Sequence, residues 1–283
     1  DKAHGGRMGN VLTLNGKPVE NIEVLAGERL RLRLLNAANA RIMAIEFEGH
    51  APIIAALDGQ PVKPFAPDGN VVLLAPSQRA DVILDMTADA GSKSRIMILT
   101  GREQVHIGDI VYKARKRRRE KTLSDLFALP PNPMPVELDL DRAVTTDLIM
   151  TGGAMGGLPN ARYQGRDYAL RELVREHGKV WAFNGEAGMT SEPLARYQLG
   201  QTVKIRIVNQ TAWPHAMHFH GHHVREVAHS KRAALPHWRD TILMLPREEV
   251  TVAFVAHNPG KWMCHCHMLE HQAGGMATWF EVE

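Results

Sequence analysis

Short stretches in which apolar and polar residues alternate, separated by Gly, Asn and Pro, make up most of the chain. Alternation with a period of two is typical of β-strands that bury one face, so the pattern predicts an all-β fold. One stretch differs. RDYALRELVREHG, residues 166–178, has helical spacing and predicts a short helix with Leu170, Leu173 and Val174 on one face.

The strand-like stretches occur twice in the same order. Between residues 10 and 100 they are NVLTLNGK, EVLAGERLRLRLLNA, MAIEFEGH and ADVILDM, and later they are KVWAFNGE, YQLGQTVKIRIVNQ, HAMHFHGHHV and EEVTVAFVAH. At a near-constant offset, the matching positions are Asn15 with Asn184, Asn36 with Asn209, and Gly49-His50 with Gly221-His222. Two copies at one offset indicate a duplicated β-sandwich unit.

A charged, proline-rich segment separates the two copies. KARKRRREK is followed by LPPNPMP within residues 113–140, a composition typical of a solvated and fairly stiff connector. We therefore predict a first domain over residues 1–112, the connector over 113–140 and a second domain over 141–283. The basic run Arg115–Arg119 could bind an anionic surface, but charge runs are more often linkers.

Composition places the chain among ordinary globular proteins, with 44% apolar and 23% charged residues in 283. The formal net charge of +3 is too small to argue for nucleic acid, and no apolar run approaches the ~18 residues of a membrane span. The first residues, DKAHGGRMGN, lack the apolar core of a signal peptide, which fits a processed or truncated chain as well as a cytosolic one. A disulfide between Cys264 and Cys266 would be strained, so none is expected.

The run GKWMCHCHMLEHQAGGM, residues 260–276, carries the most specific chemistry. His271 follows Cys266 by five residues, and Met276 follows His271 by five more. A thiolate, an imidazole and a thioether are the ligands of a blue-copper centre, which uses two His, one Cys and a weak axial Met. Zinc is the alternative, but it prefers four strong ligands and rarely uses a thioether.

Two further histidines flank the cysteine. If GKWMCHCHM is a strand, His265 and His267 point to the face opposite Cys266, so one strand serves two metal sites. A second run, WPHAMHFHGHHV at residues 213–224, supplies His215, His218 and His220. His218 and His220 would share one strand face.

Together the two runs read H-x-x-H-x-H and H-C-H-x-x-x-H-x-x-x-x-M. This pattern closely resembles the last domain of the multicopper oxidases, the family of laccases, ascorbate oxidase, bilirubin oxidase and bacterial copper-tolerance oxidases. The resemblance implies two tandem cupredoxin-like Greek-key β-sandwich domains. It also implies the copper ligands: type 1 copper on His215, Cys266, His271 and Met276, type 2 on His218, and type 3 on His220, His265 and His267.

The resemblance further implies a reaction. Type 1 copper would take single electrons from a phenol, an aromatic amine or a metal ion, and the backbone from Cys266 to His265 and His267 would carry them onward. Dioxygen would be reduced to two waters at a cluster of type 2 and type 3 copper, with four coppers in the complete enzyme. A bacterial periplasmic or secreted location is implied as well.

The first copy lacks these ligands. Aligned at the Gly-His pair, the counterparts of His215, His218 and His220 are Met43, Glu46 and Glu48. The first copy therefore resembles the metal-free middle domain of three-domain oxidases.

A complete cluster needs about eight histidines, and the other half comes from H-x-H pairs in the family's first domain. Residues 1–200 contain only isolated histidines. We expect an N-terminal cupredoxin domain outside this chain to supply them, and the chain alone not to turn over dioxygen.

Three further residues are candidates near the site. Asp240 could hydrogen-bond near a type 1 histidine or accept a phenol proton, although a salt bridge with Arg239 or Arg247 is an equal alternative. His222 would lie beside the ligands, and Gln272 stands where some bacterial relatives have a proton-delivering carboxylate. Two other functions stay open: a copper nitrite reductase, or a module that carries electrons or sequesters copper.

Overall fold

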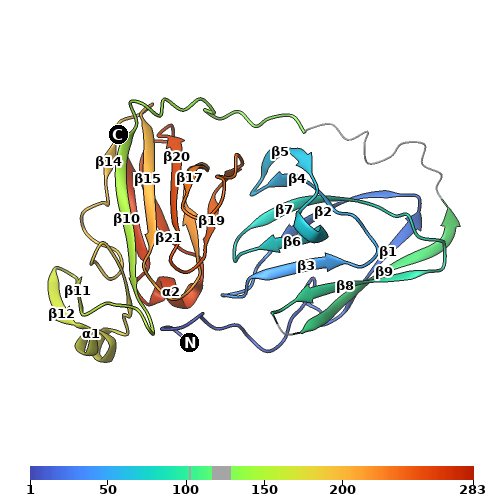
Figure 1. Cartoon of the computed structure of the whole chain (residues 1–283), viewed down its shortest axis with the longest axis horizontal. Coiled ribbons are helices and arrows are strands. Elements are labelled where there is room, and N and C mark those ends of the chain that lie inside the picture. The colour runs from blue at the N-terminus through green and yellow to red at the C-terminus, as the bar shows by residue number, and fades with distance from the viewer. Residues whose placement is uncertain (102, 117–128) are drawn as a thin grey trace. The chain divides into compact units, whose positions relative to one another are not determined.

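The computed structural model describes residues 1–101, 103–116 and 129–283 and divides into two compact units (Figure 1). One unit comprises residues 9–37 and 42–132, and the other comprises residues 1–8, 38–41 and 133–283. We call them the first and second unit. Within the predicted connector, residues 117–128 lie outside the described residues, and they include Arg117, Arg118 and Arg119 of the basic run.

The first unit contains two β-sheets. The five-stranded sheet has the order β1 (Glu20–Ala26), β9 (Gln104–Lys116), β8 (Lys93–Leu99), β3 (Met43–Phe47) and β6 (Val71–Leu74). The four-stranded sheet has the order β2 (Arg29–Leu35), β7 (Arg79–Asp85), β4 (Ile53–Leu57) and β5 (Gln60–Phe65), and a 3-10 turn, η1, spans Asp68–Asn70. One apolar core joins residues of both sheets, among them Phe47 and Leu84. Strand β9 continues past the limit predicted at residue 112.

The second unit is also a two-sheet sandwich. Its six-stranded sheet has the order β13 (Trp181–Phe183), β10 (Val144–Gly152), β15 (Thr202–Asn209), β20 (Glu249–Val255), β17 (Val224–His229) and β18 (Trp238–Arg239). Its five-stranded sheet has the order β14 (Arg196–Tyr197), β22 (Ala277–Val282), β21 (Gly260–Cys266), β16 (His215–Phe219) and β19 (Thr241–Met244). The rings of Phe254 and Phe280 meet between the sheets at 5.6 Å. The predicted all-β, two-sandwich fold is confirmed.

Among the residues that the structure describes, α-helical structure is limited to α1 (Leu170–His177) and α2 (Leu269–Ala273). The predicted short helix is therefore present, but it begins at Leu170, because the residues before it form β12 (Arg166–Ala169) and pair with β11 (Asn160–Tyr163). Leu173 is buried while Val174 is 41% exposed, so the apolar face is narrower than predicted. No helix of the described residues is long and apolar enough to cross a membrane.

The duplication is visible in matching turns and amide bonds. Asn15 and Asn184 both have positive φ angles, 53° and 51°, each before a glycine in a tight turn. The Nδ2 atom of Asn36 donates to the Leu74 carbonyl at 2.8 Å, and that of Asn209 donates to the Leu245 carbonyl at 2.9 Å. The matching asparagines therefore form equivalent side-chain hydrogen bonds in the two sandwiches.

Candidate metal centre

Strand pairing brings the two histidine-containing runs together. Strand β21 pairs antiparallel with β16, and the register places His265 opposite His218 and Cys266 opposite Met217. Because successive side chains of a strand alternate between faces, Cys266 and the flanking histidines point to opposite sides. The fold thus creates two clusters, one on each side of β21.

On one side of β21, three side chains converge. Among the residues that the structure describes, His215, Cys266 and His271 place their ligand atoms within 4.8 Å of one another, and all three are fully buried. The two Nδ1 atoms are 3.0 Å apart, and each lies 3.7 Å from Cys266 Sγ. Helix α2 brings His271 to this point, directly after β21.

Hydrogen bonds fix which ring nitrogen of each histidine faces the cluster. His271 Nε2 lies 2.6 Å from the His4 carbonyl oxygen, which can only accept, so Nε2 carries the proton. His215 Nε2 lies 2.8 Å from Thr211 Oγ1, whose own proton is donated to Asn209 Oδ1 at 2.7 Å. Both Nδ1 atoms therefore present lone pairs to the cluster.

Burial keeps this group uncharged without a metal. It lowers the pKa of His271 to about 4 and that of His215 well below its ordinary value, with the neighbouring His271 adding to the effect on His215. Burial also raises the pKa of the Cys266 thiol to about 12. The lone pairs of the two Nδ1 atoms therefore face each other in a buried site, and no proton bound between them removes their repulsion.

The donor set fits a soft or borderline cation. Two imidazole lone pairs and one sulfur converge at this point, and no single protein hydrogen can bond to both nitrogens. A metal ion could bind both nitrogens and the sulfur, and it would displace the thiol proton. Met276 is also fully buried, and its backbone forms hydrogen bonds with two residues of the group. Its N–H donates to the His271 carbonyl at 2.9 Å, and its carbonyl accepts from Cys266 N–H at 3.1 Å. Two imidazoles and a cysteine sulfur, with a buried methionine bonded through its backbone to two of these residues, suit copper better than zinc.

On the other side of β21, the remaining predicted ligands form a histidine cluster. The ring of His218 lies 4.6 Å from that of His220 and 5.6 Å from those of His265 and His267. The Nε2 atoms of His220 and His265 are 3.1 Å apart. All four imidazoles thus gather at one place.

The tautomers of two of these rings are also determined. His218 Nδ1 donates to the Asp240 carbonyl at 3.1 Å, and His265 Nδ1 donates to the Cys266 carbonyl at 3.0 Å. Their Nε2 lone pairs are then available to a metal. Burial lowers the pKa of His265 to about 4, so this ring stays neutral.

The structure places the three additional candidates differently from one another. Asp240 lies beside His218, a predicted type 2 ligand, with Oδ1 at 3.5 Å from Nδ1. The ring of His222 contacts the aromatic core, including Phe254 at 4.9 Å. Gln272 lines a surface hollow of about 560 Å³ on the outer side of α2.

Three residues at the first cluster were not identified from the sequence. Trp181 is fully buried, and its ring lies 5.1 Å from that of His215 and 4.6 Å from that of His271. Thr211 and His4 supply the oxygen partners of the two ligand rings. The repeat offers a signal for two of them, since Leu12 and Ala38 occupy the positions of Trp181 and Thr211 in the metal-free copy.

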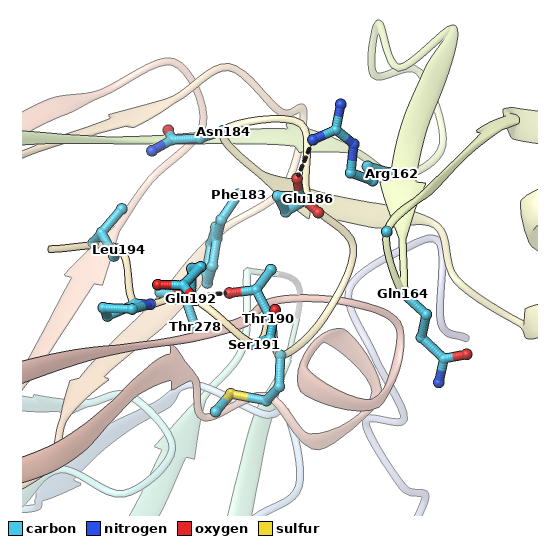
Figure 2. A pocket seen from close by; sticks show the side chains of 13 residues that line it. Arg162, Gln164, Phe183, Asn184, Glu186, Thr190, Ser191, Glu192, Leu194 and Thr278 are labelled. Carbon is cyan, nitrogen blue, oxygen red and sulfur yellow. Dashed lines mark hydrogen bonds and ion pairs between the residues drawn. The ribbon is translucent and has the colours of Figure 1, made fainter.

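A larger surface hollow of about 680 Å³ lies between the β11–β12 hairpin and the segment after β13. Figure 2 shows Arg162 and Glu186 pointing toward one another at its wall, where their charged groups are 3.6 Å apart. None of the histidines or cysteines described above lines it. This hollow therefore contributes no residue to either of the two clusters on the sides of β21.

Comparison with known proteins agrees with this geometry. Family models described as multicopper oxidase match residues 3–105 and 167–283. Multicopper oxidase MmcO of Mycobacterium tuberculosis is 30% identical over 89% of this chain and 46% of its own length.

Solved structures give the same result. A multicopper oxidase of Pseudomonas thermotolerans is 25% identical with a TM-score of 0.77, covering 100% of this chain and 62% of its own. Lac15 from a marine microbial metagenome is 32% identical with a TM-score of 0.67, covering 92% of this chain and 56% of its own. The chain spans about half the length of the curated relatives it matches. Because matching models cover both halves, the chain belongs to the multicopper oxidase family, whose cofactor is copper.

Proposed function

We propose that the chain is the electron-accepting part of a laccase-like oxidase. The complete enzyme takes one electron at a time from a donor and combines four electrons and four protons with one dioxygen to give two waters. The observation that carries this proposal is the pair of buried Nδ1 lone pairs, 3.0 Å apart, facing Cys266 Sγ. Bound copper supplies the one-electron redox chemistry.

The residues take separate roles in this proposal. His215, Cys266, His271 and Met276 would hold type 1 copper. His218 would hold type 2 copper, and His220, His265 and His267 would hold type 3 copper. The hydrogen bonds to Thr211 and to the His4 carbonyl orient the type 1 rings, and the bond from His218 to the Asp240 carbonyl orients the type 2 ligand.

Strand β21 connects the two sites covalently. Cys266 is bonded through its backbone to both His265 and His267, so an electron that reaches the sulfur has a short covalent path to the histidine cluster. The bond from His265 Nδ1 to the Cys266 carbonyl, at 3.0 Å, adds a second connection. The electron donor, a phenol, an aromatic amine or a metal ion, stays outside the buried type 1 group.

Four histidines are half of what the oxygen-reducing cluster needs. We propose that a further N-terminal cupredoxin domain, outside residues 1–283, supplies the other half. The relatives support this, because they are about twice as long as the matched segment. The resemblance to bacterial oxidases also supports a periplasmic or secreted location, which fractionation of the source cells would test.

A second function follows if no such domain joins the chain. The four residues proposed for type 1 copper all belong to the second unit, so the chain alone would be a copper-binding electron carrier. Nitrite reduction is less favoured because it does not require four clustered histidines.

Copper content and oxygen uptake of the purified, copper-loaded chain distinguish these proposals. The oxidase proposal expects a type 1 signal and no sustained oxygen uptake until the missing domain is added, after which uptake appears. Four-electron oxygen reduction by the chain alone would refute the role given to the missing domain. Absence of a type 1 signal would refute both functions.

A further inference from the structure

The first residues of the chain lie against the type 1 ligands, within the second unit. The Lys2 carbonyl accepts from Trp181 Nε1 at 2.6 Å, and the His4 carbonyl accepts from His271 Nε2 at 2.6 Å. Arg7 N–H donates to Glu270 Oε2 at 3.1 Å. We call residues 2–7 the N-terminal strap.

We propose that the N-terminal strap is the outer wall of the type 1 site and that electrons enter the protein at His4. The inference rests on the proposed function. The backbone carbonyl of His4 positions the His271 ring, which makes His4 a positioning residue. The imidazole ring of His4 contacts the electron donor, and we call this its donor-contact role.

The positioning role follows from the geometry. A metal-bound histidine is oriented by the partner of its other ring nitrogen, and here that partner is a backbone carbonyl of the strap. A second bond ties the strap to Trp181, whose ring contacts both type 1 histidines. Displacing the strap would release His271 and Trp181 together.

The donor-contact role follows from exposure. His271 is fully buried, so an external donor does not touch its ring. In the chain of residues 1–283 the side chain of His4 is exposed, and its ring packs edge-on against Trp213 at 5.3 Å. An aromatic donor can stack on these two rings, and the His4 ring is linked to His271 through the Cβ, Cα and carbonyl group of His4 and one hydrogen bond.

Gly6 offers a way to displace the strap. It has a φ of +79°, and a Cβ there would lie 2.6 Å from Ala40 Cβ and 3.1 Å from Glu270 Oε2. Gly9 is the matched control, because its φ of +68° imposes the same backbone strain but a Cβ there meets nothing within 4 Å.

The test uses the copper-loaded full chain and follows its visible type 1 band. Gly6→Val should weaken copper affinity, measured by competition with a chelator, about 10- to 100-fold, while Gly9→Val keeps the affinity of the unchanged chain. Equal affinity in both variants would overturn the positioning role. If Gly6→Val does not fold, deletion of residues 1–7 replaces it, and unchanged affinity there overturns the role equally.

His4→Ala keeps the carbonyl and removes the exposed ring. The variant is measured at full copper loading, and anaerobic bleaching of the band by hydroquinone should slow roughly 2- to 10-fold, the value of one aromatic contact. Bleaching by hexaammineruthenium(II), which cannot stack, should not change. Equal effects on both reductants, or no effect on either, would overturn the donor-contact role. A chain without any type 1 band would instead refute the proposed function.

Discussion

His215 and His271 present the same ring atom, Nδ1, to Cys266 because each gives its other nitrogen to an oxygen acceptor. One acceptor is a side chain, Thr211, and the other is a backbone carbonyl, that of His4. The difference matters experimentally, because a side-chain acceptor can be removed by one isosteric substitution.

Thr211→Val removes the acceptor of His215 Nε2–H and should weaken type 1 copper affinity about tenfold. Because Thr211 also donates to buried Asn209, the free energy of unfolding should fall by about 1–2 kcal/mol. Thr278→Val changes another buried threonine and serves as the control. Chelator competition and urea unfolding measure the two effects, and a variant with unchanged copper affinity would contradict the assigned tautomer.

His50 is the counterpart of His222 in the first unit, and we expect it to make the free energy of unfolding depend on pH. Burial lowers its pKa, with the bond to the Glu48 carbonyl opposing the effect, and its Nε2 accepts from the Tyr112 hydroxyl at 2.6 Å. A histidine whose folded-state pKa is lowered stabilises the fold above its ordinary pKa near 6.5, and this contribution is lost as the pH falls below that value.

His50→Gln should therefore reduce the loss of stability of the metal-free chain between pH 7 and pH 5, at a cost of about 1 kcal/mol at neutral pH from the altered hydrogen bond. Urea unfolding at the two pH values provides the measurement. An identical pH dependence in both chains would show that His50 does not contribute.

At the scale of elements, strand periodicity was sufficient to predict the sandwiches and the duplication. It also placed Cys266 and its flanking histidines on opposite faces of β21, as the structure has them. Periodicity does not show which segments far apart in sequence meet in the fold. Trp181 of β13, which is far from β21 in sequence, was therefore not identified. For the same reason a contact of Asp240 with His218 was not among the alternatives considered for it. The predicted start of α1 was too early, because residues 166–169 form β12 and pair with β11, which only the tertiary structure determines.

Strand β13 depends on close packing between Trp181 and glycines of the segment after β10. Gly153 has a φ of +75°, and a Cβ there would overlap the Trp181 ring. Gly153→Ala should therefore displace the indole, weaken type 1 copper binding and lower the free energy of unfolding by about 1–3 kcal/mol.

Gly157→Ala is the control for this substitution, because a Cβ at Gly157 meets nothing within 4 Å. Thermal unfolding and the type 1 spectrum report the two effects. Equal behaviour of the two variants would contradict the role assigned to the indole.

At the scale of the whole molecule, the division of the chain is less simple than the sequence indicated. Residues 1–8 and 38–41 belong to the second unit, although both precede most of the first unit in sequence. No composition or periodicity marks them, and part of their contribution is made by backbone atoms such as the His4 carbonyl. The duplicated halves have also diverged in chemistry, since the first unit keeps the sandwich and its Asn36 bond but has Met43 where the second has His215.

The central claim is that Cys266, and not its strand neighbour Cys264, is a copper ligand in the second unit. The most direct test is the visible and paramagnetic-resonance spectrum of the copper-loaded chain and two variants. The unchanged chain and Cys264→Ala should both show an intense thiolate-to-copper absorption and the narrow hyperfine splitting of a type 1 centre, and Cys266→Ser should show neither. A blue centre that survives in Cys266→Ser, or its absence from the unchanged chain, would contradict the account.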